Sequence, residues 1–362
     1  MIFKKKIIIS FDHGYFKNII TKNNLRPALL LINKGKVKKL SYPFFRIPSE
    51  FIDNKDLIRG ELPKIETKKL KKLPRFGFTG IAKNHDLIFA LSANSIYVID
   101  RKTLKLKKIL TNKLTADNHG IDFYKNKIYS LLTFRDTLVI TNLDGSLNSS
   151  FTIDENLNVT KNDKKLKNID WRFITKQRRG PTGHFHFNFI RVTKKKVYLT
   201  SRNIGCLIEL DINKKKAKLI TFGHQKCSLI HDGVKANDNL YFTSVDGKIL
   251  IVNLIKKINA QERIFKTNFN LKIFKNSYNL KYFIINKSNL KRTPTWCRGI
   301  EIIGKQKIIT TVDGVYGSKG FSVVGFDIKK NKKLFEYKIN KQGNFENPKY
   351  IRYLSGFSII SI

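Results

Sequence analysis

Residues 80–110 read GIAKNHDLIFALSANSIYVIDRKTLKLKKIL, a pattern of short apolar runs separated by polar turns. Each run has the length of a β-strand, and the Asn, Asp and Lys residues between the runs suit hairpin turns. The chain has no long apolar stripe with a period of 3.6 residues, so we expect few helices. The segment therefore predicts a unit of about four antiparallel strands.

The same pattern recurs along the chain. Further copies occupy residues 120–151, 188–222, 233–254 and 299–339. Repeated four-stranded units of this spacing are typical of the blades of a β-propeller. We therefore predict an all-β fold in which residues 1–362 form a single propeller domain.

The two ends of the chain are expected to complete the ring. Residues 350–360 (YIRYLSGFSII) read as the first strands of a copy, and residues 6–14 and 28–40 read as later strands. Pairing strands from both ends would remove the exposed edges of the sheet. We predict six blades. Seven is the alternative, because residues 357–361 and residues 6–10 compete for the second-strand position.

Positive charge is the strongest bias in the composition. The chain has 71 Lys and Arg residues against 27 Asp and Glu residues, a net charge of +44. Such an excess suits nucleic acid, an anionic polysaccharide or an acidic membrane surface. However, the lysine clusters at 193–196, 212–216 and 328–333 fall in expected hairpin turns, and no nucleic-acid-binding motif is present. Nucleic acid is an alternative partner, but the placement favours solvated turns.

Other features of the sequence indicate a cytoplasmic protein. No stretch approaches the roughly 18 apolar residues needed for a transmembrane segment. The first apolar run extends only from Ile7 to Ile9, which makes a poor signal peptide. The cysteines, Cys206, Cys227 and Cys297, are far apart and include no C-x-x-C pair, so neither a disulfide framework nor a cysteine zinc site is expected.

The innermost strands of a propeller line a central channel, and the loops that enter them lie at one mouth. We expect this mouth to gather the residues that precede the first strand of each copy, together with two from the loops after second strands. They are Thr79, His119, His186, His231, Arg298, Arg135 and Arg202. Two longer connections, residues 155–183 and 269–296, are expected to be inter-blade loops on the same face, and the first carries Arg179.

Residues 179–190 (RGPTGHFHFNFI) hold two of the seven histidines. Alternation predicts that His184, His186 and Asn188 lie on one side of a strand and the intervening phenylalanines on the other. His119, His186 and His231 could hold a divalent metal, act as general acid or base, or serve as a nucleophile. They could equally be channel residues that only hydrogen-bond water.

Three short motifs carry a resemblance to a known family. Residues 184–188 (HFHFN), 200–203 (TSRN) and 231–233 (HDG) resemble those of the bacterial arylsulfotransferases. The resemblance implies a six-bladed propeller in which a histidine takes a sulfuryl group from an aryl sulfate and passes it to a phenol. It makes His231 the nucleophile candidate, and the sulfate-binding candidates are His119, His186, Asn188 and Arg202. The blades are also similar to gluconolactonase-like and streptogramin-lyase-like propellers, whose centres bind a divalent metal.

These observations lead to two hypotheses. The first is an enzyme that acts on a small anionic substrate by arylsulfotransferase-like group transfer or by metal-dependent lyase or hydrolase chemistry. Its catalytic candidates are His231, His186 and His119, and its substrate-binding candidates are Asn188, Arg202, Arg298, Arg135, His184 and Arg179. The sequence identifies no cofactor beyond the candidate metal. The second hypothesis is a non-catalytic propeller that binds a protein or an anionic polymer.

Overall fold

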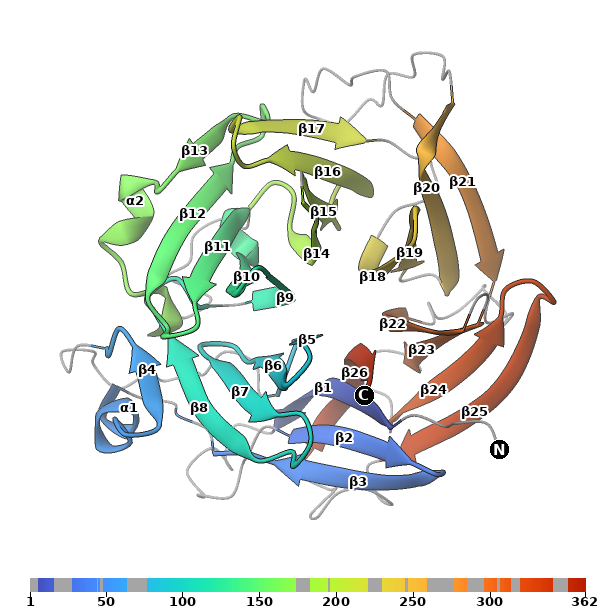
Figure 1. Ribbon diagram of the computed structural model, residues 1–362, viewed down its shortest axis with the longest axis horizontal. Helices are drawn as coiled ribbons and strands as arrows, with labels where there is room; N and C mark the ends of the chain where they lie inside the picture. The colour runs from blue at the N-terminus through green and yellow to red at the C-terminus, as the bar shows by residue number, and fades with distance from the viewer. Residues whose placement is uncertain are drawn as a thin grey trace.

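Six small sheets surround a central axis (Figure 1). The computed structural model describes residues 6–15, 28–43, 45, 48–63, 77–116, 118–173, 183–194, 196–220, 230–244, 247–258, 277–284, 296–304, 307–313, 320–340 and 351–362. The strands of each repeat pair in antiparallel fashion, and the first strand of each repeat lies nearest the axis. The expectation of an all-β, six-bladed propeller is confirmed.

The blades follow the repeats of the sequence, and we number them in chain order. Blade 1 contains β5 (Gly80–Lys83), β6 (Leu87–Leu91), β7 (Ile96–Asp100) and β8 (Leu106–Thr111). Blade 2 contains β9 (Asn118–Tyr124), β10 (Lys127–Leu132), β11 (Thr137–Asn142) and β12 (Leu147–Ile153). Blade 3 contains β14 (Phe187–Val192), β15 (Val197–Ser201), β16 (Cys206–Asp211) and β17 (Lys216–Ile220).

The remaining blades complete the ring. Blade 4 contains β18 (Ile230–Ala236), β19 (Asn239–Ser244), β20 (Lys248–Ile258) and β21 (Ser277–Ile284). Blade 5 contains β22 (Trp296–Gly304), β23 (Lys307–Asp313), β24 (Gly320–Asp327) and β25 (Lys332–Asn340). The closing blade contains β26 (Ile351–Ser361), β1 (Ile7–Tyr15), β2 (Ala28–Asn33) and β3 (Lys36–Ser41).

Both ends of the chain meet in the closing blade, as predicted. β26 is the innermost strand and β1 lies second, with Ile9 opposite Ile359 and Ile7 opposite Ser361. This order resolves the competition between residues 357–361 and residues 6–10, because the C-terminal segment takes the axial position. Main-chain hydrogen bonds between β1 and β26 then close the ring.

A few elements decorate the blades. β4 (Ile58–Gly60) pairs in parallel with β8 and follows α1 (Pro48–Asp53), and β13 (Val159–Lys161) extends blade 2 beyond β12. The other short elements are η2 (Thr133–Arg135), α2 (Lys164–Lys167) and η3 (Trp171–Phe173). No helix in these described ranges is long and apolar enough to cross a bilayer.

The two expected inter-blade loops differ from the prediction. Residues 155–183 include β13, α2 and η3, so this connection is partly ordered secondary structure. Residues 269–296 include β21, the outermost strand of blade 4. The connection to blade 5 therefore begins after β21 and is shorter than predicted. Residues 277–284 (SYNLKYFI) do carry apolar residues, but they are separated from the rest of the fourth copy, which the repeat placed at residues 233–254.

The hydrophobic core lies between neighbouring blades. In β6, Phe89 and Leu91 pack towards blade 2, and Ile88 and Ala90 pack towards the closing blade. Each sheet is covered on both faces, so the inner strands read as nearly continuous apolar runs. The lysine clusters at 212–216 and 328–333 lie in the exposed β16–β17 and β24–β25 turns, as expected.

Glycines allow the innermost strands to converge on the axis. A Cβ added at Gly299 would lie 2.6 Å from the carbonyl oxygen of Phe357 on β26. A Cβ added at Gly120 would lie 3.0 Å from the carbonyl oxygen of Asn188 on β14. Because these neighbours are backbone atoms, a side chain at either position would push adjacent blades apart.

We expect Gly299→Ala to reduce the free energy of unfolding by about 1–3 kcal/mol, since the added methyl group overpacks the contact between β22 and β26. Gly304→Ala is a matched control on the same strand, where a Cβ would approach only Lys307, at 3.9 Å. Its effect should stay within about 0.5 kcal/mol. Urea unfolding of both variants measures the difference, and equal stabilities would contradict the convergence argument.

Candidate functional site

The innermost strands share an irregularity at one level of the channel. β9, β14, β18, β22 and β26 each shift register against the neighbouring strand of the same blade. The residues at these bulges are His119, Gly120, Asn188, His231, Asp232, Gly299, Phe357 and Ser358. A bulge bends the strand and re-aims its side chains, and bulges are common beside functional sites.

Three histidines from three blades meet at this level. The ring centroids of His119 and His186 are 5.5 Å apart, and those of His119 and His231 are 6.4 Å apart. The ring of Phe357 lies 6.1 Å from His119 and 5.9 Å from His231, and the guanidinium carbon of Arg298 lies 4.2 Å from the Phe357 centroid. We call these five residues the histidine cluster. The sequence-predicted trio is therefore brought together in space.

Most of the histidine cluster is removed from solvent. His119 and His231 are each 4% exposed, and Arg298 is 7% exposed. A buried guanidinium beside buried imidazoles makes a site that is rich in hydrogen-bond donors and low in dielectric. An anion placed among these groups would interact more strongly than one at the open surface.

His231 is oriented by its neighbour in the sequence. Its Nδ1 lies 3.2 Å from Oδ2 of Asp232, and the same oxygen accepts the N–H of Gly299 at 3.1 Å. If Nδ1 carries the proton in this contact, Nε2 keeps its lone pair. Burial lowers the pKa of His231, Arg298 and Arg202 lower it further, and Asp232 opposes the change. His231 is therefore a neutral imidazole near pH 7.

The HFHFN segment departs from the predicted alternation. His186 has a φ of +53°, and β14 begins only at Phe187. Phe187 packs in the core between blades 2 and 3, but Phe189 packs in the core between blades 3 and 4. The bulge at Asn188 reverses the side that each following residue faces, so the expectation of three phenylalanines on one side is wrong.

Asn188 is fully buried at this bulge. Among the residues that the structure describes, neither atom of its amide group has a hydrogen-bond partner. A buried amide in a native protein normally pairs with protein, water or a ligand. Asn188 is thus a polar group with unused hydrogen-bonding capacity, within β14 and two residues from His186.

Asp136 holds the histidine segment in place. Its two carboxylate oxygens accept the N–H groups of Phe185 at 2.9 Å and His186 at 2.8 Å. Residues 200–203 (TSRN) hold the same segment from the other side. The hydroxyl of Ser201 donates to the carbonyl oxygen of Phe185, and the backbone N–H of Arg202 donates to the carbonyl oxygen of His186. These contacts explain how His186 keeps a left-handed backbone conformation. Burial raises the pKa of Asp136 to about 7, although the N–H groups favour the ionised form.

The other predicted residues are distributed more widely. Arg202 lies close enough to His231 to lower the pKa of its imidazole. Arg135 stacks on Trp171, with its guanidinium carbon 4.6 Å from the ring, which gives it a packing contact on blade 2. His184 packs edge-on against Phe185, and burial lowers its pKa. Arg179 lies outside the described residues.

The geometry does not support the candidate metal site. In the described part of the chain, no group of three or more His, Cys, Asp or Glu side chains is arranged to hold a metal ion. The structure therefore gives no support to a metal ion held by His119, His186 and His231.

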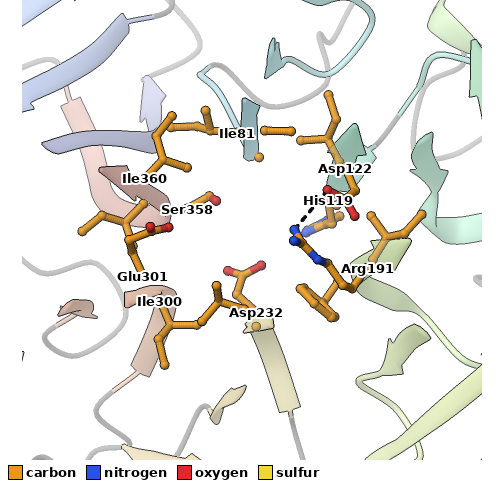
Figure 2. A pocket seen from close by; sticks show the side chains of 18 of the residues that line it. Ile81, His119, Asp122, Arg191, Asp232, Ile300, Glu301, Ser358 and Ile360 are labelled. Atoms are coloured by element: carbon orange, nitrogen blue, oxygen red, sulfur yellow. Dashed lines mark hydrogen bonds and ion pairs between the residues drawn. The ribbon is translucent and has the colours of Figure 1, made fainter. Parts of the chain in front are cut away.

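A cavity of about 170 Å³ occupies the axis beside the cluster (Figure 2). All six innermost strands contribute to its lining, and His119 and Asp232 belong to both the lining and the surroundings of His231. The propeller axis is thus hollow where the inner strands run past the bulges.

Sequence reasoning missed Phe357 and Asp136. Phe357 precedes Ser358 on β26 just as Arg298 precedes Gly299 on β22, so alignment of the C-terminal segment with the other copies was the available signal. Asp136 offered no comparable signal, because its partners are backbone groups 49 and 50 residues away.

We expect Asp136→Asn to reduce the free energy of unfolding by about 1–3 kcal/mol, because the new amide NH2 would face a backbone N–H donor. The folded pKa of about 7 exceeds the usual 3.8, so the contribution of Asp136 is complete at low pH and declines as pH rises through 7. The penalty should therefore shrink between about pH 4 and pH 7. Denaturant unfolding across this range tests the trend. Asp86→Asn, at an exposed turn, is the control, and a penalty that grows with pH would contradict it.

Comparisons with known proteins bear on the fold. No protein-family model and no curated protein sequence matches the chain. A chain of a nidogen–laminin complex matches with a TM-score of 0.51 and 9% identity, over 98% of this chain and 97% of that one. Virginiamycin B lyase from Staphylococcus aureus matches with a TM-score of 0.47 and 13% identity, over 92% and 88%. U3-55K matches with a TM-score of 0.48 and 9% identity, over 93% and 83%. At 9% identity, the match to the nidogen–laminin chain shows a likeness of fold alone. None of these matches tests the resemblance to the arylsulfotransferases.

Proposed function

We propose that the histidine cluster binds a small anionic substrate and that His231 reacts with it. One observation carries the proposal: His119 lies within 5.5 Å and 6.4 Å, centroid to centroid, of two further imidazoles, beside a buried arginine. Structural residues rarely bring this many titratable side chains to one buried point, whereas active sites do so regularly.

The cluster offers both charge and hydrogen bonds to an anion. Arg298 and Arg202 supply guanidinium groups, which match the oxygens of sulfate, phosphate or carboxylate. His119 and His186 supply ring N–H donors, and Asn188 adds an amide one residue into β14. These groups would neutralise negative charge that develops on the substrate oxygens during the reaction.

His231 suits the reacting role because it is neutral and oriented. Its contact with Asp232 directs Nε2 away from the carboxylate, so that Nε2 can take a proton or attack an electrophile. In the arylsulfotransferase-like form of this proposal, Nε2 attacks the sulfur of an aryl sulfate and the bond from sulfur to the aryl oxygen breaks. A phenol acceptor then attacks the sulfur, the N–S bond breaks, and the acceptor's proton passes to the released phenolate. The resemblance of residues 184–188, 200–203 and 231–233 to that family supports this form.

We expect His231→Ala to reduce kcat/KM for an aryl sulfate by about 100-fold or more, since a positioned base or nucleophile contributes at least this much. Assays should compare aryl sulfates with lactones, using wild type, His231→Ala and His85→Ala. His85 lies in an exposed turn and is the matched control. Equal rates in all three proteins would exclude a catalytic role. Salt-sensitive binding of an anionic polymer without turnover would favour the non-catalytic alternative.

The pH profile provides a separate test of His231. Because burial lowers its pKa below the usual 6.5, the neutral base persists to lower pH, and activity should fall only below pH 6.5. Asp232 opposes this shift, so Asp232→Asn should move the acid limb of kcat to still lower pH while reducing kcat. An acid limb above pH 6.5, or an upward shift in the variant, would be inconsistent with His231 as the reacting group.

A further inference from the structure

The axial cavity has a polar ring of its own. Each of the six innermost strands contributes at least one polar or charged side chain to its lining. Apart from His119, they are Lys83, Asp122, Arg191, Asp232, Glu301 and Ser358. Figure 2 shows Arg191, Asp232 and Glu301 directed from different sides towards the central space. The side chains between them are largely apolar, and Ile81, Ile300 and Ile360 form part of the wall.

Two ion pairs account for the cationic members of this ring. Nη1 of Arg191 lies 3.3 Å from Oδ1 of Asp122, and Nζ of Lys83 lies 3.5 Å from Oε1 of Glu301. Burial raises the pKa of Asp122, but Arg191 and the N–H of Val192 oppose that rise. Each cation therefore already has a carboxylate partner.

Asp232 has no such cation. It is 7% exposed, and its Oδ2 accepts from Gly299 and contacts the neutral His231. In the described part of the chain, no lysine or arginine pairs with Asp232, and no hydrogen bond reaches its Oδ1 or Oε2 of Glu301. Within the described ranges, no cation pairs directly with this buried carboxylate, so a cation supplied by a ligand would stabilise it.

The charge of the lining also disfavours an anion. The chain as a whole has 71 basic and 27 acidic side chains, yet three carboxylates and two basic groups face this cavity. Arg191 keeps further donors, since its guanidinium group carries five N–H groups and only Nη1 pairs with Asp122. The complementary ligand carries an ammonium group and, at another point, an oxygen acceptor.

The size and access of the cavity define the ligand further. The cavity volume is about 170 Å³, and one water occupies about 30 Å³ in the liquid. The cavity could therefore hold five or six waters, which limits the ligand to roughly that number of non-hydrogen atoms. The side chains of Arg191 and Lys83 are 39% and 30% exposed, whereas that of Asp122 is 9% exposed. The cavity therefore opens near Arg191 and Lys83, towards the C-terminal ends of the inner strands and away from the histidine cluster.

We propose that the axial cavity binds a small amino alcohol as its ammonium cation. The ammonium group contacts the carboxylates of Asp232 and Glu301, which are directed into the same central space (Figure 2). The hydroxyl oxygen accepts from the guanidinium group of Arg191, and the isoleucines contact the methylene chain. This site adjoins the proposed anion site and shares His119 and Asp232 with its surroundings, but its remaining charged groups, Lys83, Asp122, Arg191 and Glu301, lie outside the histidine cluster.

Isothermal titration calorimetry of the wild-type protein tests the ligand class without any variant. The probes are aminopropanol, propanediol and hydroxypropanoate, each with its two functional groups at the ends of a three-carbon chain. They match in size and differ in charge. We expect the amine to bind with a Kd of about 1 mM or tighter and at least about tenfold more tightly than the other two. Equal affinity for the diol, tightest binding of the anion, or no binding of the amine would overturn the proposal.

Glu301→Gln tests the location. The change is nearly isosteric and should weaken amine binding by about tenfold or more, since it removes one of two carboxylates from the ammonium. Asp86→Asn removes the same charge at an exposed turn and should leave the affinity unchanged. Thermal unfolding of Glu301→Gln verifies the fold before titration. Equal weakening in both variants would show a general surface effect, and no weakening in either would place the amine elsewhere; both results refute the site. Because titration requires no turnover, failure of the proposed enzymatic function would leave this test unaffected.

Discussion

Close approach of the innermost strands at the axis is the constraint on which the rest of this propeller depends. A blade is a twisted sheet, and six of them leave little room where their inner edges meet. Gly80, Gly120 and Gly299 relieve this crowding, because a Cβ at any of them would approach the neighbouring inner strand within 3.0 Å. The strands also bulge at this level, which turns them past one another without losing the flanking main-chain hydrogen bonds.

The candidate site is a consequence of that convergence. The bulges needed to close the ring also re-aim the side chains beside the glycines, and these side chains include His119, His231 and Phe357. Their positions are therefore fixed by main-chain pairing within rigid blades. A catalytic or binding group gains from such rigidity, because orientation has been established during folding and need not be established on binding.

The repeat carried most of what the sequence could predict. It specified the blade boundaries, the closure by both chain ends and the meeting of His119, His186 and His231, since equivalent positions in a ring must converge. The bulges made the predicted side-chain orientation wrong within a strand. One extra residue at Asn188 moved Phe189 to the opposite face, and alternation alone has no means of locating such a residue. The role of Asp136 could not be predicted for another reason. Its partners are backbone N–H groups, which nearly every residue supplies.

Asp232 belongs both to the axial cavity and to the surroundings of His231. One of its carboxylate oxygens contacts His231 and accepts the N–H of Gly299, while the side chain also lines the axial cavity. A cation bound at the cavity would compete with the imidazole for the negative charge of this one carboxylate. Since that charge is what raises the pKa of His231 against burial, a cation would favour the neutral imidazole still more. The cavity and His231 would thus interact through the side chain of Asp232, without any movement of the blades.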